Sequence, residues 1–179
     1  MLVTIFAAAI EGISSNLIRV EVKVTQGIKY FLVGLPDNAI KEGYYRIESA
    51  FNECNLKIPR KKIIVNLAPA NIKKVGSSYD LSIAIGILIS DRQLKVDNIS
   101  DFLIMGELSL DGSIMPIKGA LSIVIMAKNM GIKNVIIPER NISECCIING
   151  INIYGAEKLS QVIDFLKNKV DLNKSQYFK

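Results

Sequence analysis

The sequence contains no histidine and no tryptophan. Without histidine the chain has no Ser-His-Asp or Cys-His nucleophilic site, no His-containing zinc site and no imidazole for acid–base catalysis. It also lacks the G-x-x-x-x-G-K-[ST] motif, so it carries no P-loop for a nucleotide. No apolar run reaches the roughly 20 residues that a membrane-spanning helix needs. These absences exclude several common enzyme classes and predict a protein without a membrane partner.

Cysteine is scarce, and its three copies are Cys54, Cys145 and Cys146. Their spacing provides no C-x-x-C pair for a metal or for redox exchange. We therefore expect buried or idle thiols in a reducing cytoplasm. Residues 1–9 are apolar, but they lack a basic leader and run quickly into Glu11, so we interpret them as a strand rather than a signal sequence.

The composition favours one compact domain: the chain has 179 residues, half of them hydrophobic. At this length folding buries roughly two-thirds of the surface of the unfolded chain, so neither a disulfide nor a metal is needed for stability. Lys and Arg number 22 against 17 Asp and Glu, a net charge of +5. This charge permits an acidic partner such as nucleic acid, although a modest excess is more typical of a solvated surface.

The N-terminal segments carry the pattern of a sheet. Residues 17–25 alternate apolar and polar side chains, which is the period of a half-buried strand. A short Gln-Gly turn leads into a further apolar segment at 28–33. The pattern predicts a hairpin of these two strands, with residues 1–9 as a third partner.

A helix is predicted after this sheet, with Asp37 as its N-terminal cap. Within it, Glu42 precedes Arg46 by one turn, in the order that favours an ion pair. We expect its inner face to pack on the sheet. The apolar stripe, at spacings of three and four, is Ile40, Tyr44, Ile47, Phe51 and Cys54.

The segment 81–89 is apolar on nearly every side, which predicts a buried central helix. Asp80 is the best candidate for its N-cap. Ser77 and Ser78 lie just before it, and Asn66 lies on the preceding strand. For these polar side chains we favour hydrogen bonds to neighbouring groups over contact with a ligand.

The densest basic cluster is KIPRKK at 57–62, in a loop before the strand expected at 63–67. Clustered cations on a loop are the expected footprint of contact with a phosphate backbone. No aromatic side chains are interleaved to stack bases, so an ordinary solvated loop is the alternative. The candidate DNA-contacting residues, including a second basic pair, are Lys57, Arg60, Lys61, Lys62, Lys73 and Lys74.

Strands and helices alternate in the second half, which favours an α/β layer over a helical bundle. Glu107 and Asp111 lie near a Leu-Asp-Gly turn, and we expect them to form a salt bridge or stabilise the turn rather than bind magnesium. The polar segment 171–179 is interpreted as the start of a linker. The expected elements are strands at 102–107, 113–115, 134–137 and 151–154 and helices at 120–130 and 157–169.

Four blocks of sequence occur in order: VGLPDNAIKE at 33–42, IIVNLAPANIKKVGSSYDLSIAIGIL at 63–88, GELSLDGSIMPIKGAL at 106–121 and GIKNVIIPE at 131–139. Together they resemble the N-terminal domain of the ComM/YifB family, often described as magnesium-chelatase-related. The resemblance implies an α/β (α+β) fold with mixed sheets and packed helices. Such a fold is similar to the proteolytic domain of Lon protease and the C-terminal domain of the RadA recombination ATPase, and it would occupy residues 1–170.

In the full-length family this domain precedes an AAA+ ATPase module, implicated as a hexameric DNA helicase that promotes branch migration during natural transformation. The resemblance therefore implies DNA, the protein's own AAA+ module and further copies of the chain as partners. ATP and magnesium are expected only in that module, which is absent from this chain. We expect assembly, and DNA contact through the basic loops, to be the contribution of this domain.

Lon-type proteases use a Ser-Lys dyad, and the resemblance places Ser78 on the nucleophile position. The Lon pattern continues with Ala-Gly, whereas Tyr-Asp follows here. The partner lysine lies seven residues after the proline of the third block, Pro116, and this position is Ile123. A hydrocarbon cannot accept a proton, and Lys118 would replace it only if its loop folded back. We expect a domain without catalytic, cofactor or metal residues; the alternatives are a Lon-like serine peptidase remnant and a purely structural oligomerisation module.

Overall fold

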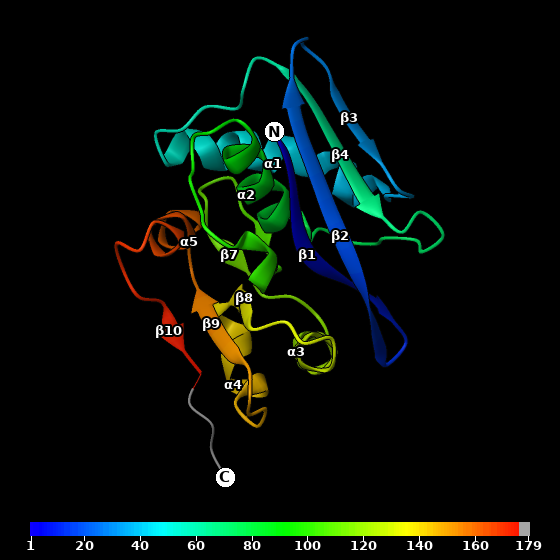
Figure 1. Cartoon of the computed structure of the whole chain (residues 1–179), viewed down its shortest axis with the longest axis vertical. Coiled ribbons are helices and arrows are strands. Elements are labelled where there is room, and N and C mark those ends of the chain that lie inside the picture. The colour runs from blue at the N-terminus through cyan, green and yellow to red at the C-terminus, as the bar shows by residue number, and fades with distance from the viewer. Residues whose placement is uncertain (176–179) are drawn as a thin grey trace.

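The computed structural model describes residues 1–175, which form one mixed eight-stranded sheet with helices packed against it (Figure 1). The strand order is β10-β9-β8-β5-β1-β2-β4-β3, and β6 and β7 pair separately. The α/β class predicted from the sequence is confirmed. The strands are β1 Leu2–Glu11, β2 Ser14–Thr25, β3 Tyr30–Val33, β4 Lys62–Ala68, β5 Phe102–Ile104, β6 Glu107–Leu108, β7 Ile114–Met115, β8 Asn134–Pro138, β9 Asn152–Ala156 and β10 Asn173–Lys174. The helices are α1 Asn38–Glu53, α2 Asp80–Ser90, α3 Ala120–Asn129, α4 Ile142–Cys145 and α5 Leu159–Leu166, with 3-10 turns η1 Ile99–Asp101 and η2 Glu139–Asn141.

The predicted hairpin between residues 17–25 and 28–33 is wrong. β4 lies between these strands, antiparallel to β2 and parallel to β3, while β2 forms its hairpin with β1. Burial explains the order. Ile63, Val65 and Leu67 of β4 are almost fully buried, whereas β3 has four residues with alternate ones exposed, a pattern that suits the edge of a sheet.

The C-terminal half adds parallel strands that alternate with helices, as predicted. β5, β8 and β9 run parallel to one another, and β5 runs parallel to β1. β10 pairs antiparallel with β9, and Leu172 just before it is buried. Within the segment interpreted as a linker from residue 171, Asn173 and Lys174 therefore form a strand of the sheet. The last residues of that prediction, 176–179, lie outside the described residues.

α2 is the buried centre of the domain, as the apolar segment predicted. Each of its residues is buried; it packs on β1 and β2 and against α1, which lies on the same side of these strands (Figure 1). Gly86 permits the contact with the sheet, because a Cβ there would stand 2.6 Å from Cγ2 of Val22. No helix within residues 1–175 combines the length and the apolar composition needed to cross a membrane.

The two central helices begin differently. Asp37 caps α1 as predicted, because its carboxylate accepts a hydrogen bond from the Ile40 N–H at 3.0 Å. The prediction that Asp80 caps α2 is wrong. Tyr79 occupies the cap position without a side-chain hydrogen bond, and Asp80 is the first helical residue with its side chain fully buried. Its carboxylate is engaged by a guanidinium from α1 instead of by the helix N-terminus.

Candidate functional site

The two positions that the resemblance compared with a Ser-Lys dyad line one cavity of about 480 Å³. Ser78 reaches it from the loop before α2, and Ile123 reaches it from α3. The end of β1, further residues of the loop before α2, Met105, Glu107 and the segment 116–118 also line it. The fold thus brings together residues that are 45 positions apart in the sequence (123 − 78).

Among residues 1–175, the Ser78 hydroxyl forms no hydrogen bond with a lysine. Ile123 presents only a fully buried hydrocarbon side chain. Lys73 and Lys118 line the same cavity, but among residues 1–175 no ammonium group makes a hydrogen bond to the Ser78 hydroxyl. A serine hydroxyl without a nearby proton acceptor is a weak nucleophile. In the described residues, position 123 therefore does not supply the lysine of a Ser-Lys dyad.

The other polar residues of this region stabilise loops. The Ser77 hydroxyl donates to the Glu107 carboxylate and ties the loop before α2 to β6. Asp111 accepts hydrogen bonds from the backbone N–H and the hydroxyl of Ser113, both at 3.0 Å, as predicted for a turn-stabilising residue. These two bonds lower the pKa of Asp111. Within the described part of the chain, no three His, Cys, Asp or Glu side chains lie together as a metal site would require.

Asn66 and the cysteines also have structural surroundings. The Asn66 amide donates to the Glu21 carboxylate on β2 at 2.8 Å, which agrees with the favoured interpretation. All three cysteines are free thiols. Cys145 is fully buried, and this burial raises its pKa to about 12. Its thiol therefore stays protonated near neutral pH.

A buried ion pair, which sequence reasoning missed, lies two residues beyond Ser78. The Asp80 carboxylate accepts two hydrogen bonds from Arg46 of α1, at 2.6 and 3.0 Å, and one from the Leu108 N–H at 3.2 Å. Burial raises the pKa of Asp80, and the Arg46 hydrogen bonds oppose that rise. The bond to Asp80 in turn raises the pKa of Arg46. In the sequence, the spacing of Glu42 and Arg46 predicted Glu42 as the ion-pair partner of Arg46, whereas the structure pairs Arg46 with Asp80.

Lys74 is fully buried, and this burial removes it from the predicted DNA-contacting set. Its ammonium group donates to the backbone carbonyls of Gly34, at 2.8 Å, and Pro69. Burial lowers the pKa of Lys74. The side chain joins the segment after β3 to the loop after β4, so it has a structural role and cannot reach a phosphate in solution.

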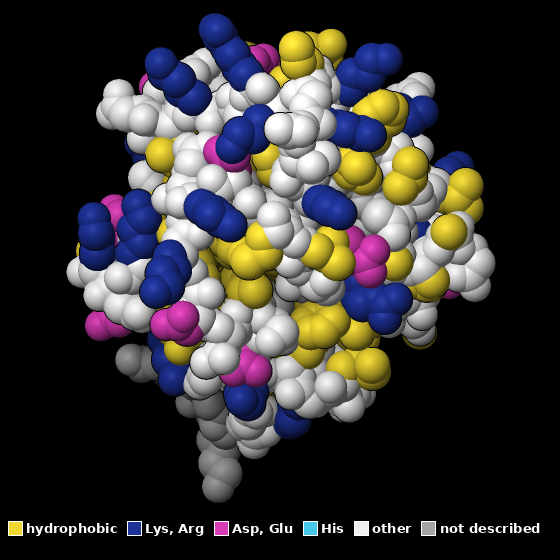
Figure 2. All heavy atoms as spheres, turned by 45° about the horizontal axis from the view of Figure 1, so that its top comes forward, with side chains coloured by type: hydrophobic (Ala, Val, Ile, Leu, Met, Phe, Trp, Pro, Cys, Tyr) yellow, Lys and Arg dark blue, Asp and Glu magenta, His cyan; other side chains and the backbone are white. Residues whose placement is uncertain are grey.

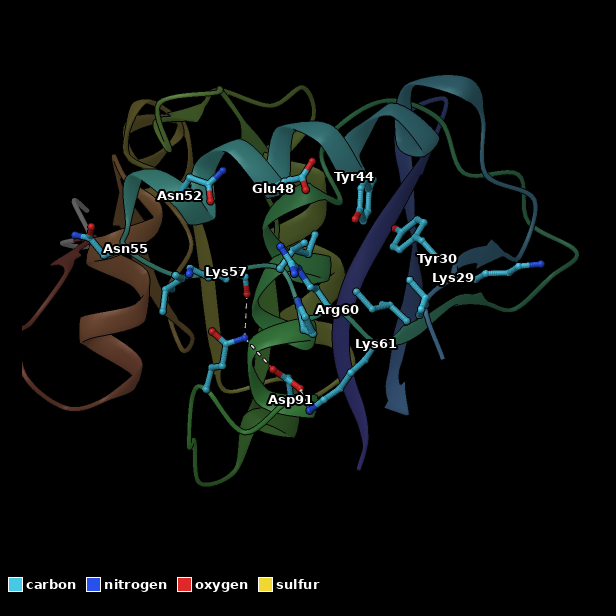
Figure 3. A pocket seen from close by; sticks show the side chains of 16 residues that line it. Lys29, Tyr30, Tyr44, Glu48, Asn52, Asn55, Lys57, Arg60, Lys61 and Asp91 are labelled. Atoms are coloured by element: carbon cyan, nitrogen blue, oxygen red, sulfur yellow. Dashed lines mark hydrogen bonds and ion pairs between the residues drawn. The ribbon is translucent and has the colours of Figure 1, made fainter. Parts of the chain in front are cut away.

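Three of the other predicted cations line a second and larger cavity, of about 960 Å³ (Figure 3). Lys57, Arg60 and Lys61 all lie in the segment just before β4 and are exposed. The Lys61 ammonium is 2.7 Å from the Asp91 carboxylate and so is partly neutralised. Lys57 and Arg60 form no ion pair with any described residue.

The remaining two cations lie elsewhere. The Lys62 ammonium stands over the ring of Phe31, 5.2 Å from its centroid, and Lys73 lines the Ser78 cavity. The two basic loops are attached to opposite ends of β4, whose seven residues span roughly 20 Å. Figure 2 shows lysine and arginine side chains scattered among other types on the face in view. The predicted cations therefore do not form one continuous basic site.

Comparison with known proteins adds to this geometry. Residues 20–141 match the family described as subunit ChlI of Mg-chelatase. The chain is 34% identical over 172 residues to competence protein ComM of Haemophilus influenzae and 36% identical over 159 residues to the uncharacterized protein YifB of Escherichia coli. These alignments cover 96% and 88% of this chain but only 34% and 31% of the relatives. The chain thus spans about a third of the length of the curated relatives it matches.

A lower identity, 27% over 123 residues, relates the chain to peroxisomal Lon protease homolog 2 of Oryza sativa subsp. indica, with 65% of this chain and 13% of that protein covered. This similarity is consistent with the Lon-like fold expected from the sequence. The family match from 20 to 141 includes every wall of the Ser78 cavity except the end of β1. The chain therefore belongs to the family of subunit ChlI of Mg-chelatase, with ComM and YifB among its relatives.

Proposed function

We propose that this chain is a non-catalytic accessory domain of an AAA+ ATPase that acts on DNA. The family match and the greater length of the relatives support a domain that works beside an ATPase module. One relative is named a competence protein, which supports a role in natural transformation. Within that process we propose DNA branch migration as the step in which the full-length protein acts. In this proposal the protein is cytoplasmic, its partners are DNA, its AAA+ module and other copies of the chain, and ATP and magnesium belong to that module.

The observation that carries the proposal is the hydrocarbon side chain of Ile123 in the cavity of Ser78. A general base lies within hydrogen-bond reach of the group that it deprotonates, about 3 Å between the two heavy atoms, or acts through one water. Neither Lys73 nor Lys118 makes such a contact with Ser78 in the described chain. A cavity that holds Ser78 together with Ile123 in place of a lysine supports a role in assembly and contact over one in peptide cleavage.

A serine-reactive probe tests the catalytic part of the proposal. After incubation with a fluorophosphonate, we expect mass spectrometry to find no adduct on Ser78, and we expect no cleavage of casein. An active Lon protease is the positive control for the probe. Labelling that disappears in Ser78→Ala and persists in Ser77→Ala would show an activated nucleophile and overturn the proposal.

A salt titration tests the DNA part. Contact of the 57–61 segment with phosphates predicts duplex affinity that falls steeply with salt, because each contact releases counterions. In fluorescence anisotropy, Lys57→Ser should reduce the salt slope by about one, whereas the exposed Lys167→Ser should not. If the chain shows no salt-sensitive affinity for DNA, the DNA part is wrong and only assembly remains.

The second candidate is a Lon-like serine peptidase remnant, favoured by the presence of Lys118 in the Ser78 cavity. It predicts casein cleavage that is lost in Lys118→Met. The third candidate is a purely structural oligomerisation module, favoured by the exposed Phe31 and Val33 on the edge strand β3. It predicts a dimer or hexamer in light scattering without affinity for DNA.

A further inference from the structure

The larger cavity lies between α1 and the segment 56–61 (Figure 3). Tyr44 and Glu48 reach it from α1, and Arg60 lies across from them. Its volume of about 960 Å³ is near the upper end of the range of ligand cavities, roughly 300–1,000 Å³. The cavity therefore has room for a small molecule or for part of a polymer.

Tyr30 carries a polar group in this cavity that has no partner. Its hydroxyl is buried and finds no hydrogen-bond acceptor or donor among residues 1–175. Figure 3 shows the hydroxyl end of Tyr30 directed toward Tyr44 and α1. Burial raises the pKa of Tyr30, so the hydroxyl keeps its proton and remains a donor. Buried polar groups are nearly always hydrogen-bonded, so this hydroxyl marks the wall beside Tyr44 as incompletely satisfied.

The cavity also offers an aromatic surface. The rings of Tyr30 and Tyr44 pack together, with centroids 4.8 Å apart and planes tilted by 52°. Tyr44 is only half-buried, so part of its ring is open to a ligand. Aromatic rings of this kind are the usual platform for an unpaired base.

Basic side chains of the segment 57–61 lie across the cavity from the two tyrosine rings. Hydrogen bonds fix this segment, and its positive charge is only partly neutralised. The Gln93 amide donates to the carbonyl of Lys57 at 3.1 Å and to the Asp91 carboxylate at 2.9 Å, which anchors the basic segment to the end of α2. Lys61 is paired with Asp91, but Arg60 is exposed and has no carboxylate partner in the described chain. A guanidinium in this state is a strong ligand for phosphate.

From these features we infer that the cavity binds an unstacked nucleotide of single-stranded DNA, with its base against Tyr44 and its phosphate on Arg60. A duplex cannot enter in this way, because its bases are stacked inside the helix and only its phosphates are presented. Single strands can turn their bases outward onto aromatic side chains. This inference rests on the proposed contact with DNA and specifies the form of DNA and the residues that recognise it.

Fluorescence anisotropy with the 179-residue chain tests the inference, using a labelled oligothymidylate and a labelled hairpin duplex of equal phosphate number. Tyr44→Leu should weaken single-strand binding about tenfold and leave duplex binding unchanged, because only stacking on a base is lost. Tyr44→Phe should retain the affinity. The matched control is Tyr154→Leu, because Tyr154 is half-buried like Tyr44, lies on β9 and does not line the cavity.

A second pair of variants tests the phosphate contact. Arg60→Ser should weaken single-strand binding about tenfold, whereas Arg140→Ser, which removes the same charge in the other half of the molecule, should have little effect. This pair also provides the decisive comparison if Tyr44→Leu fails to fold by circular dichroism. Thymidine 5′-monophosphate, added as a competitor, separates a free nucleotide from a strand.

The outcomes separate this inference from the proposed function. If single strand and duplex bind with equal affinity and Tyr44→Leu changes neither, the inference is overturned while the proposed DNA contact stands. If neither form binds, both are overturned. If the mononucleotide binds as tightly as the oligonucleotide, the cavity is a site for a free nucleotide and the inference is wrong.

Discussion

At the scale of single residues, the absence of a Cβ at Gly43 leaves room for the buried Asp80 carboxylate, which binds Arg46. A Cβ built at this position would lie 2.4 Å from Oδ1 of Asp80. Asp80 is fully buried, and its charge is matched by two hydrogen bonds from Arg46. Because a buried charge without a partner is strongly destabilising, the approach of α1 to α2 at Gly43 matters for the whole core.

Gly43→Ala tests this close approach. In a helix interior, alanine is normally more stable than glycine by about 1 kcal/mol. Here we expect the opposite sign, a loss of about 2 kcal/mol, because the added methyl group displaces the Asp80 carboxylate or α1 itself. Urea unfolding measures the change, with Glu42→Ala at an exposed site of the same helix as control. A stabilised Gly43→Ala protein would show that α1 and α2 are not so close.

At the scale of elements, the start of α1 is joined to the loop that carries Ser78. One oxygen of Asp37 accepts from the Ile40 N–H at 3.0 Å, and the other accepts from the Gly76 N–H at 2.9 Å. The backbone N–H of Asp37 donates to the carbonyl of Lys74 at 3.1 Å. One carboxylate therefore caps a helix and positions a loop of the Ser78 cavity.

Asp37→Ala should destabilise the domain by about 2 kcal/mol, since it removes a helix cap and a second hydrogen bond of similar strength. Asp37→Asn keeps one oxygen acceptor and should lose about half as much. Thermal unfolding measures both variants, and amide hydrogen exchange at Gly76 reports the loop directly. Equal stability of Asp37→Ala and Asp37→Asn would show that the second bond contributes nothing.

At the scale of the whole molecule, two cavities lie beside the sheet. The sheet also includes residues after α5 that the polar composition of that segment did not predict. The Ser78 cavity and the Tyr44 cavity lie toward opposite ends of β4. At the other edge of the sheet, β10 pairs with β9, and Leu172 is buried beside it. The domain therefore includes the segment that follows α5.

Leu172→Ala tests this extent of the domain. Truncation of a buried leucine leaves a cavity, and we expect a loss of about 2 kcal/mol in the free energy of unfolding. Val170→Ala, two residues earlier and 47% exposed, should change it by less than about 0.5 kcal/mol. If the two variants are equally stable, the segment from 171 behaves as the linker first expected.

Local pattern predicted the elements and part of the site. The alternation over 17–25 and the apolar segment at 81–89 report burial directly, and both predictions are confirmed. The pairing of Ser78 with Ile123 was available from the ordered sequence blocks. The place of Tyr30 in a cavity was not predictable from the sequence, because its hydroxyl becomes buried only when β3 pairs with β4 beneath α1.

The sequence by itself determined the α/β class, the buried central helix, the family resemblance and the lack of a lysine at position 123. These features follow from period, spacing and residue type, which are local properties of the chain. Only the tertiary structure decided that β4 separates β2 from β3, that Asp80 turns to Arg46 and that Lys74 points inward while Lys73 stays exposed. Each of these features depends on which distant segments come into contact, because such contacts set the neighbour of a strand and the partner of a buried charge. Contacts between distant segments leave no periodic pattern in the sequence.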